Sequence, residues 1–284
     1  MYRGPIGDAP SPTSPDRRVF GWTTQHLFGL DFVADATVAE VNASLLDWRA
    51  EHPGSWRCVV TPNVDHLVRY ERHPSERDVG RTAGIVLPDG MPIVWAGRLL
   101  RRPLRARLAG SDLFSDLWPR LVGAQVPTVV VASSREVAQG LGAEHPRLRC
   151  VTPGFFDAGD AVAVTALVDE IAVACADLGA QFCIVGLSMP KHHLLAARLR
   201  QRWTGGSGGS DGARSTDPPV VLLLGASPEL YLGLTRRAPS WMQRSGLEWL
   251  FRFVQEPRRL AKRYFVDDVR FIRILVRERR ASRR

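Results

Sequence analysis

Short unbroken runs of apolar residues alternate along this chain with longer segments in which apolar residues recur every three or four positions. The runs are typical of strands, and the periodic segments are typical of helices with one buried face. Strands that are apolar at every position are buried on both sides, as in parallel sheets covered by helices. The pattern therefore predicts an α/β protein with a Rossmann-like, mostly parallel sheet. The predicted strands are 57–61, 84–87, 127–132, 147–152, 181–187 and 219–224, and the predicted helices are 35–50, 91–100, 113–122, 160–178 and 190–203, with two more that begin near 63 and 134.

Polar residues follow several of these strands directly. They are Thr61, Asn63, Asp89, Ser188 and the segment 225–227. Ligand-binding groups of parallel sheets gather at the carboxyl ends of the strands, so these residues are the candidates for a pocket. Asp89 has two interpretations, because an Asp between Pro and Gly is also a common turn residue. Asn63 is equally a natural helix N-cap, and Asp35 or Thr37 is expected to cap the helix over 35–50.

The histidines give a weaker signal. Asp65 and His66 lie on one predicted helix, but no further ligand at suitable spacing completes a metal site. His192 and His193 are adjacent on another helix, so we expect them to face different directions and at most one to face a pocket. The sequence therefore predicts no metal site. Ser111 and Asp112 are expected to cap the helix over 113–122.

Charge is concentrated at the C-terminal end. The chain has 38 basic and 29 acidic residues, a net charge of +9. Residues 236–284 alone hold 15 basic and 5 acidic residues, so the first 235 residues, with 23 basic and 24 acidic, have a net charge of −1. A near-neutral body with a cationic end predicts an anionic partner bound at that end.

This distribution divides the chain into parts. We expect a disordered leader over 1–18, an α/β body over 19–235 and a basic helical appendage over 236–284. The Gly- and Ser-rich segment 205–217 is expected to be a flexible insertion in the body. The leader has no apolar stretch typical of a signal peptide, and no run is long enough to span a membrane. Four scattered cysteines are expected to be buried free thiols, which fits a reducing cytoplasm.

The appendage has two interpretations. Leu250 and Val254 recur at helical spacing with other apolar residues, which is typical of a helix packed on the body with a solvated basic face. Arg258, Arg259 and Arg263 begin a new helix after Pro257, where basic residues oppose the helix dipole, and this favours an external anion. Arg side chains suit diphosphates and phospholipid head groups. A nucleic-acid-binding module remains an alternative, although its aromatic residues would have to be free to stack on bases.

Several motifs occur together in a fixed order. They are Thr61-x-Asn63, Asp89-Gly90, GSDLF from Gly110, Pro190-Lys191 and the long segment RAPxWM…GLEWLxRxxQEPRRLxxRY, which runs from Arg237 to Tyr264. This order resembles the WecG/TagA/CpsF family of bacterial glycosyltransferases (family 26), over roughly residues 20–280. The resemblance implies inverting transfer of a hexose-type sugar, N-acetylmannosamine or a related one, from a UDP-sugar to a polyprenyl-diphosphate-linked acceptor in cell-wall or exopolysaccharide synthesis. It implies no metal ion and no other cofactor.

The resemblance also implies roles for residues. Asp89 corresponds to the family's proposed general base, and Thr61 and Asn63 to residues that contact a sugar. The remaining positions expected at the substrate are Ser111, Asp112, Pro190, His192 and Glu229. The positions expected at the diphosphate are Arg237, Arg252, Arg258, Arg259 and Arg263. Apolar residues beside these arginines would rest on the anionic inner face of the plasma membrane, which implies a cytoplasmic, peripherally bound protein that does not bind nucleic acid.

The chain departs from the family pattern at two places. His192 and His193 stand where the family usually has Gln and Glu, and Pro228-Glu229-Leu230 stands for Phe-Asp-Phe. A catalytically inactive protein that binds a nucleotide-sugar is therefore an alternative. The sequence does not name the sugar, the acceptor or the oligomeric state.

Overall fold

The structure is a computed structural model that describes residues 18–51, 56–204, 217–235 and 268–281, together with positions 239, 242 and 251. The C-terminal arginines expected at the diphosphate, the leader over 1–17 and the insertion over 205–216 lie outside these residues. No helix within the described ranges is long and apolar enough to cross a lipid bilayer.

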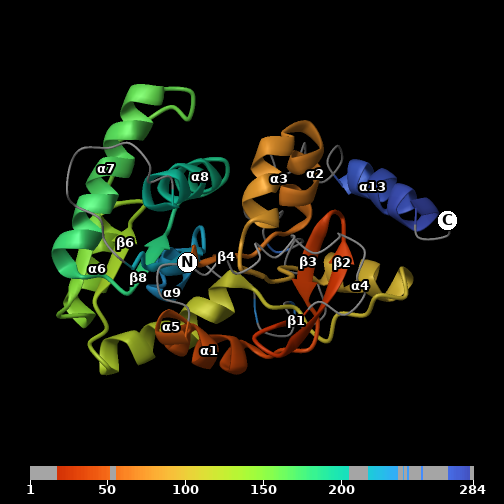
Figure 1. The fold of residues 1–284 in the computed structure, drawn as a ribbon, viewed down its shortest axis with the longest axis horizontal. Helices are drawn as coiled ribbons and strands as arrows, with labels where there is room; N and C mark the ends of the chain where they lie inside the picture. Colours follow the sequence, from red (N-terminus) through yellow and green to blue (C-terminus); the bar gives the residue numbers. More distant parts are fainter. Residues whose placement is uncertain are drawn as a thin grey trace, which may run out of the picture.

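A six-stranded sheet with parallel neighbours forms the centre of the protein (Figure 1). Its strands are β4 (Cys58–Val60), β5 (Ile85–Val86), β6 (Thr128–Val131), β7 (Leu148–Val151), β8 (Phe182–Val185) and β9 (Val220–Leu223), in the order β5-β4-β9-β8-β6-β7. Each predicted run contains one strand, so the predicted α/β fold is confirmed. The first and last of these strands, β4 and β9, are neighbours, which places the loops that follow them side by side.

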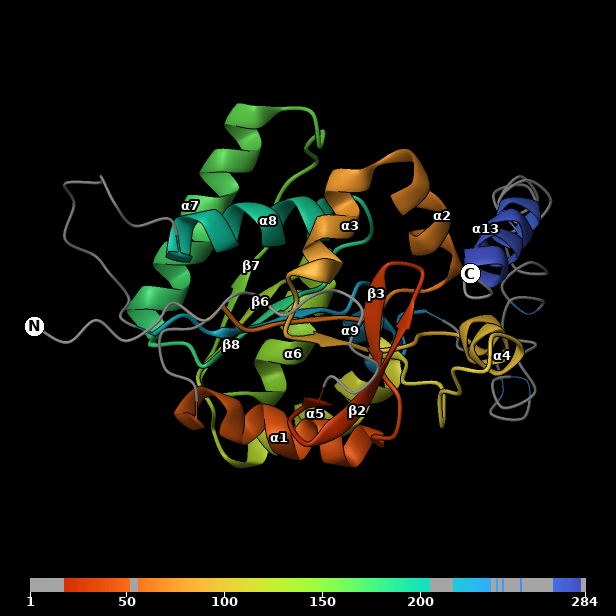
Figure 2. The same cartoon turned by 45° about the vertical axis from the view of Figure 1, so that its right-hand side comes forward.

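Helices cover both faces of this sheet, because alternate residues of each strand enter two separate apolar cores. On one face Val60 and Leu223 contribute to a core shared with α2, α3, α7 and α8. On the other face Val59 and Leu222 contribute to a core shared with α1, α5 and α6. The bounds of these helices are α1 Val38–Glu51, α2 Val64–Arg72, α3 Pro74–Arg81, α5 Gly110–Gly123, α6 Arg135–Glu144, α7 Ala161–Leu178 and α8 Lys191–Thr204. Figure 2 shows α7, α8 and α3 on one side of the sheet and α1 and α5 on the other.

Most helices begin where the sequence predicts. Asn63 caps α2, Ser134 caps α6 and Asp160 caps α7, each by accepting a hydrogen bond from a backbone N–H of the first turn. Thr37 and Glu40 exchange hydrogen bonds at the start of α1. These local signals decide the boundaries because an N-cap satisfies backbone groups that the helix itself leaves unpaired.

The predicted start of α5 is wrong. Its N-cap is Ala109, and Ser111 and Asp112 lie inside the first turn. A Cβ atom on Gly110 would lie 3.1 Å from Oγ1 of Thr61 and 3.4 Å from Oγ of Ser227. A larger residue at this position would therefore have to displace these side chains by a few tenths of an ångström, so glycine suits the close approach of α5 to the ends of β4 and β9.

Two smaller parts flank the α/β body. An antiparallel sheet is formed by β1 (Arg18–Val19), β2 (Trp22–Leu27) and β3 (Leu30–Val33). The C-terminal helix α13 (Asp268–Ala281) packs beside α2, and α4 (Met91–Leu99) lies near α13 in both views (Figures 1 and 2). The ring of Phe271 lies 5.6 Å from that of Phe28 in the β2–β3 turn. This part of the predicted basic appendage is therefore helical and docked.

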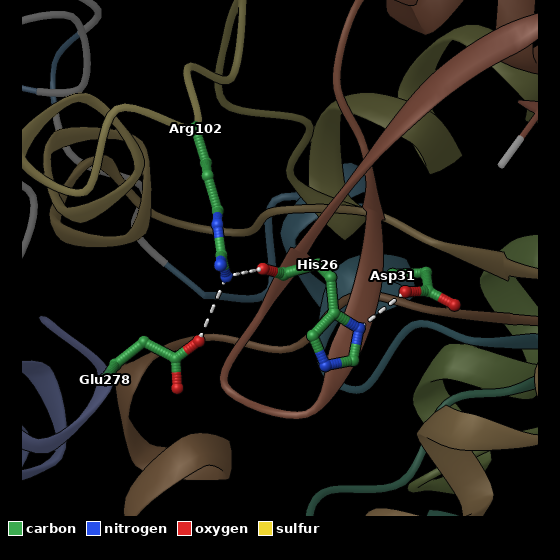
Figure 3. A network of polar contacts seen from close by, with 4 residues as sticks. All are labelled: His26, Asp31, Arg102 and Glu278. Carbon is green, nitrogen blue, oxygen red and sulfur yellow. Dashed lines mark hydrogen bonds and ion pairs between the residues drawn. The ribbon is translucent and has the colours of Figure 1, made fainter. Parts of the chain in front are cut away.

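Figure 3 shows a polar contact that joins these parts. The Arg102 guanidinium, in the segment after α4, donates to the backbone carbonyl of His26 in β2 at 2.5 Å. The same Nη1 atom lies 3.3 Å from a carboxylate oxygen of Glu278 in α13. The ring of His26 in turn lies 2.7 Å from the Asp31 carboxylate in β3. One arginine thus links α4, the small sheet and the C-terminal helix.

Candidate active site

An open cavity of about 380 Å³ lies at the carboxyl edge of the central sheet. Its walls come from segments that follow β4, β5, β8 and β9, with further residues from α2, α8 and the start of α5. All the strand-end residues selected from the sequence line it: Thr61, Asn63, Asp89, Ser188, Gly225, Ala226 and Ser227. The size and the position suit a small polar ligand in a doubly wound α/β protein.

Asp89 reaches this cavity through a tight turn after β5. Its backbone N–H donates to the carbonyl of Pro62 at 3.1 Å, which ties the β5 loop to the β4 loop. Gly90 has a φ of 117°, a conformation that residues with a side chain rarely adopt. The backbone therefore favours glycine at position 90, and the turn leaves Asp89 at the cavity wall.

Thr61 and Asn63 follow β4 on the same wall. The Asn63 side chain accepts from the backbone N–H of His66 at 3.2 Å and lies 2.7 Å from Nδ1 of His66. Asn63 is thus both the helix cap and a pocket residue, so the two interpretations of this position hold together. Ser111 also lines the cavity, from the first turn of α5.

The cavity contains two arginines that sequence reasoning missed. Arg107 lines the wall before α5, and its guanidinium donates to the Asp112 carboxylate at 2.7 Å. Arg69 of α2 also lines the wall and makes a two-pronged contact with Glu76 of α3, at 2.5 and 2.7 Å. The signal for Arg107 is the arginine-rich segment that leads directly into GSDLF. These arginines make the cavity suitable for an anionic ligand.

Three residues expected at the substrate are not part of the cavity lining. Asp112 is turned toward Arg107 and holds it. Pro190 lies at the start of α8, and the two residues before it, Ser188 and Met189, line the cavity instead. Glu229, in the short helix α9 (Ser227–Tyr231), accepts a hydrogen bond from Ser133 after β6. None of the three lines the cavity, and their contact with a substrate stays a prediction.

His192 lines the cavity as expected, but the prediction that the two adjacent histidines face apart is wrong. Both are buried, with 4% and 2% of their surfaces exposed, and their ring centroids lie 4.6 Å apart. His66 of α2 stacks on His192 at 5.6 Å and also lines the cavity. Adjacent helical residues differ in direction by only about 100°. Because α2 covers the start of α8, one buried region receives both rings.

Burial keeps these rings uncharged. It lowers the pKa of His66 to about 3 and that of His192 to about 4, and nearby His192 and Arg69 contribute further at His66. The pKa of His193 also lies well below its usual value, first because of burial and then because of the neighbouring histidines. All three are neutral at neutral pH, so they act as hydrogen-bonding or metal-ligating groups and not as cations.

The fold and the cavity define a class: a doubly wound α/β protein with an arginine- and carboxylate-lined pocket at the carboxyl edge of its sheet. A sequence profile described as "Glycosyl transferase WecG/TagA/CpsF family" matches residues 25–284. This chain belongs to that family.

Two characterised relatives carry the same name, N-acetylglucosaminyldiphosphoundecaprenol N-acetyl-beta-D-mannosaminyltransferase. The relative from Bacillus spizizenii is 24% identical over 259 residues, which cover 91% of this chain and 93% of the relative. The relative from Bacillus subtilis is 27% identical over 185 residues, which cover 63% of this chain and 64% of the relative. The resemblance seen in the motifs is confirmed.

Proposed function

We propose that this protein transfers a hexose-type sugar, N-acetylmannosamine or a related one, from a UDP-sugar to a polyprenyl-diphosphate-linked acceptor. The product would be a lipid intermediate of cell-wall or exopolysaccharide synthesis. The observation that carries the proposal is the position of Asp89 in a cavity that also holds Arg107. The names of the two relatives support the acceptor and the sugar class.

Asp89 serves as the general base in this proposal. Its carboxylate takes the proton from the acceptor hydroxyl as that oxygen attacks the anomeric carbon of the donor. The bond from the anomeric carbon to the diphosphate breaks, and UDP leaves with the electron pair. A single displacement of this kind inverts the configuration at the anomeric carbon.

Arginines offset the charge that develops on the leaving diphosphate. Arg107 is in the cavity, and the Asp112 carboxylate fixes the direction of its guanidinium. The C-terminal arginines that match the family motif would add to this charge: Arg237, Arg252, Arg258, Arg259 and Arg263. Fixed cations stabilise the departing group without reorganisation at the moment of reaction.

The acceptor lies in a membrane, and we propose that α4 and α13 rest on its inner, anionic face. Trp95 and Leu99 of α4 are 47% and 51% exposed, and Ile272 and Val276 of α13 are 58% and 43% exposed. The helix α13 also has five arginines against two acidic residues, over the sequence DVRFIRILVRERRA. Exposed apolar side chains beside arginines suit the interface of an anionic bilayer.

Vesicle sedimentation tests this surface. We expect Trp95→Glu to weaken binding to vesicles that contain anionic phospholipid. Val173→Glu is the matched control, because Val173 is 52% exposed on α7, away from α4 and α13. If both variants weakened vesicle binding equally, or if the unmodified protein did not bind the vesicles, α4 would not belong to the proposed membrane-binding surface.

The base assignment is tested by transfer from a UDP-sugar to a polyprenyl-diphosphate acceptor. We expect Asp89→Asn and Asp89→Ala to lower the rate by about 10²- to 10⁴-fold, which is the usual contribution of a general base. Asp78→Asn, at an exposed position on α3, is the control and should keep the full rate. Full transfer by both Asp89 variants would show that another group accepts the proton.

An inactive nucleotide-sugar-binding protein is the second candidate. The observation that favours it is the pair His192 and His193 at positions where the family usually has Gln and Glu, with His192 in the cavity wall. Such a protein would bind UDP but release none from any UDP-sugar in the presence of acceptor. A UDP-release assay separates the two candidates.

A further inference from the structure

Three histidines converge at the wall of the cavity. One ring nitrogen each from His66, His192 and His193 lies within 4.8 Å of the other two. His66 comes from α2 and the other two from the start of α8, so two separate segments bring the rings together.

Each ring is held by a hydrogen bond on one nitrogen. Nδ1 of His192 donates to the backbone carbonyl of Leu187 at 2.6 Å. Nδ1 of His66 lies 2.7 Å from the Asn63 side-chain oxygen, and Nε2 of His193 lies 2.6 Å from the Tyr70 hydroxyl. Metal-ligating histidines show this arrangement, because a carbonyl, amide or hydroxyl on one nitrogen fixes the ring and the tautomer. The backbone N–H of Asn63 also lies 3.3 Å from Nδ1 of His66. In the tautomer in which this Nδ1 donates to the closer Asn63 side-chain oxygen, the other nitrogen of each ring is available as a ligand.

The available nitrogen of His193 has no partner inside the protein. His193 is 2% exposed, and its Nδ1 makes no hydrogen bond with any described residue. A buried polar atom without a partner costs roughly 1–3 kcal/mol. Nδ1 can act as a ligand when Nε2 donates its proton to the Tyr70 oxygen, an orientation that the 2.6 Å contact permits. The low pKa values of the three rings keep them in the neutral form that metals bind.

We propose that His66, His192 and His193 bind one divalent transition-metal ion of the Zn²⁺ type, with a fourth position open to the cavity. His66 and His192 line the cavity, so the open position would take a water or an anionic oxygen of a bound ligand. Tetrahedral Zn²⁺ with bonds of about 2.0–2.1 Å places its ligand nitrogens roughly 3.4 Å apart, so nitrogens that lie within 4.8 Å of one another close by at most about 1.4 Å on binding. Arg69, whose charge acts on His66 and His193, is already matched by Glu76.

This site departs from the expectation of a metal-free protein, and it does not depend on the proposed transfer reaction. Metal binding is measured on the protein alone, without a sugar-nucleotide or an acceptor. Loss of metal binding and loss of transferase activity are thus separate results.

The experiment uses tag-free full-length protein, treated with EDTA and then desalted. Titration with Co²⁺, followed by competition with Zn²⁺, should show one site with the visible absorption bands of a tetrahedral ion. His192→Gln and His66→Gln should each weaken binding by at least about 100-fold, since even the loss of a group that only supports a ligand costs 10- to 100-fold.

His145→Gln is the matched control. His145 is also 2% exposed, and its Nε2 has no partner among the described residues, but it lies apart from the three-histidine site. It should bind Co²⁺ as the unmodified protein does. Circular dichroism confirms the fold of each variant, and His66→Gln serves if His192→Gln does not fold. Absence of binding, equal affinity in the folded ligand variants, or a thiolate charge-transfer band from cysteine coordination would overturn the proposal.

Discussion

Phe271 is one of the two buried apolar side chains, with Ile274, by which the described part of α13 docks on the body. It is 8% exposed, its ring lies 5.6 Å from that of Phe28, and it belongs to the core that α2 and α8 share. Burial of a Phe side chain stabilises by about 1.5–3 kcal/mol, and an aromatic pair adds about 0.5–1.5 kcal/mol. The change Phe271→Ala should therefore weaken docking by about 2–4 kcal/mol, which is roughly 30- to 1,000-fold in the docking equilibrium.

Limited trypsin digestion measures this change, because α13 contains Arg273, Arg277 and further arginines. Cleavage that requires undocking follows the population of the open form when reclosing is fast. We expect cleavage within α13 to accelerate at least about 10-fold in Phe271→Ala. Ile272→Ala, at the neighbouring position that is 58% exposed, should be cut at the unmodified rate. Equal cleavage rates for the Phe271 variant and the unmodified protein would refute the claim that the Phe271 ring holds α13 on the body.

Three further predictions concern the cavity and the fold. Asp112→Asn removes the carboxylate to which the Arg107 guanidinium donates at 2.7 Å, so we expect a higher KM for the UDP-sugar with little change in melting temperature, measured by steady-state kinetics and thermal denaturation. Gly90→Ala forces a side chain into a φ of 117°, which should cost about 1–3 kcal/mol in urea unfolding and lower the transfer rate by displacing Asp89. Burial lowers the pKa of His145 in the folded protein. As the pH falls below about 6.5, His145 therefore takes up a proton in the unfolded chain but not in the folded protein, and the free energy of unfolding decreases as the pH falls. The loss between pH 7.5 and 5.5 should be smaller in His145→Gln than in the unmodified protein, and equal losses would contradict the assignment.

Much of the fold could be predicted because its signals are local. Strands buried on both faces read as unbroken apolar runs, and Asn63, Ser134 and Asp160 cap the helices predicted to begin there. Functional groups gather at the carboxyl ends of parallel strands, and this rule also predicted that Thr61 and Asp89 share one cavity. The strand order β5-β4-β9-β8 places these ends together.

The rest depends on contacts between distant segments. The resemblance implied that Glu229 and Asp112 contact the substrate, and in the structure Glu229 accepts from Ser133 while Asp112 accepts from Arg107. Helix α5 begins at Gly110, before the predicted start at 113, and its first residue lies against the Thr61 side chain. No sequence motif of fixed spacing predicts that Glu229 pairs with Ser133 or that Asp112 pairs with Arg107.

The three-histidine site shows more clearly that local sequence patterns do not predict contacts between distant segments. His66 and His192 are far apart in sequence, and the spacing of His192 and His193 on one helix argued against a joint role. Both rings contact side chains of α2, His192 through His66 and His193 through Tyr70. Tertiary packing thus created a ligand cluster that periodicity excluded.

The measurement that tests the central claim most directly is transfer by the unmodified protein. Purified protein, anionic vesicles and a polyprenyl-diphosphate-linked acceptor are incubated with a panel of UDP-sugars, and the lipid product is identified by mass spectrometry. The proposed function predicts that the acceptor gains one sugar residue as one UDP is released, and that Asp89→Asn abolishes both. Release of UDP without acceptor modification, or no product from any UDP-sugar while UDP still binds, would contradict the proposed transfer.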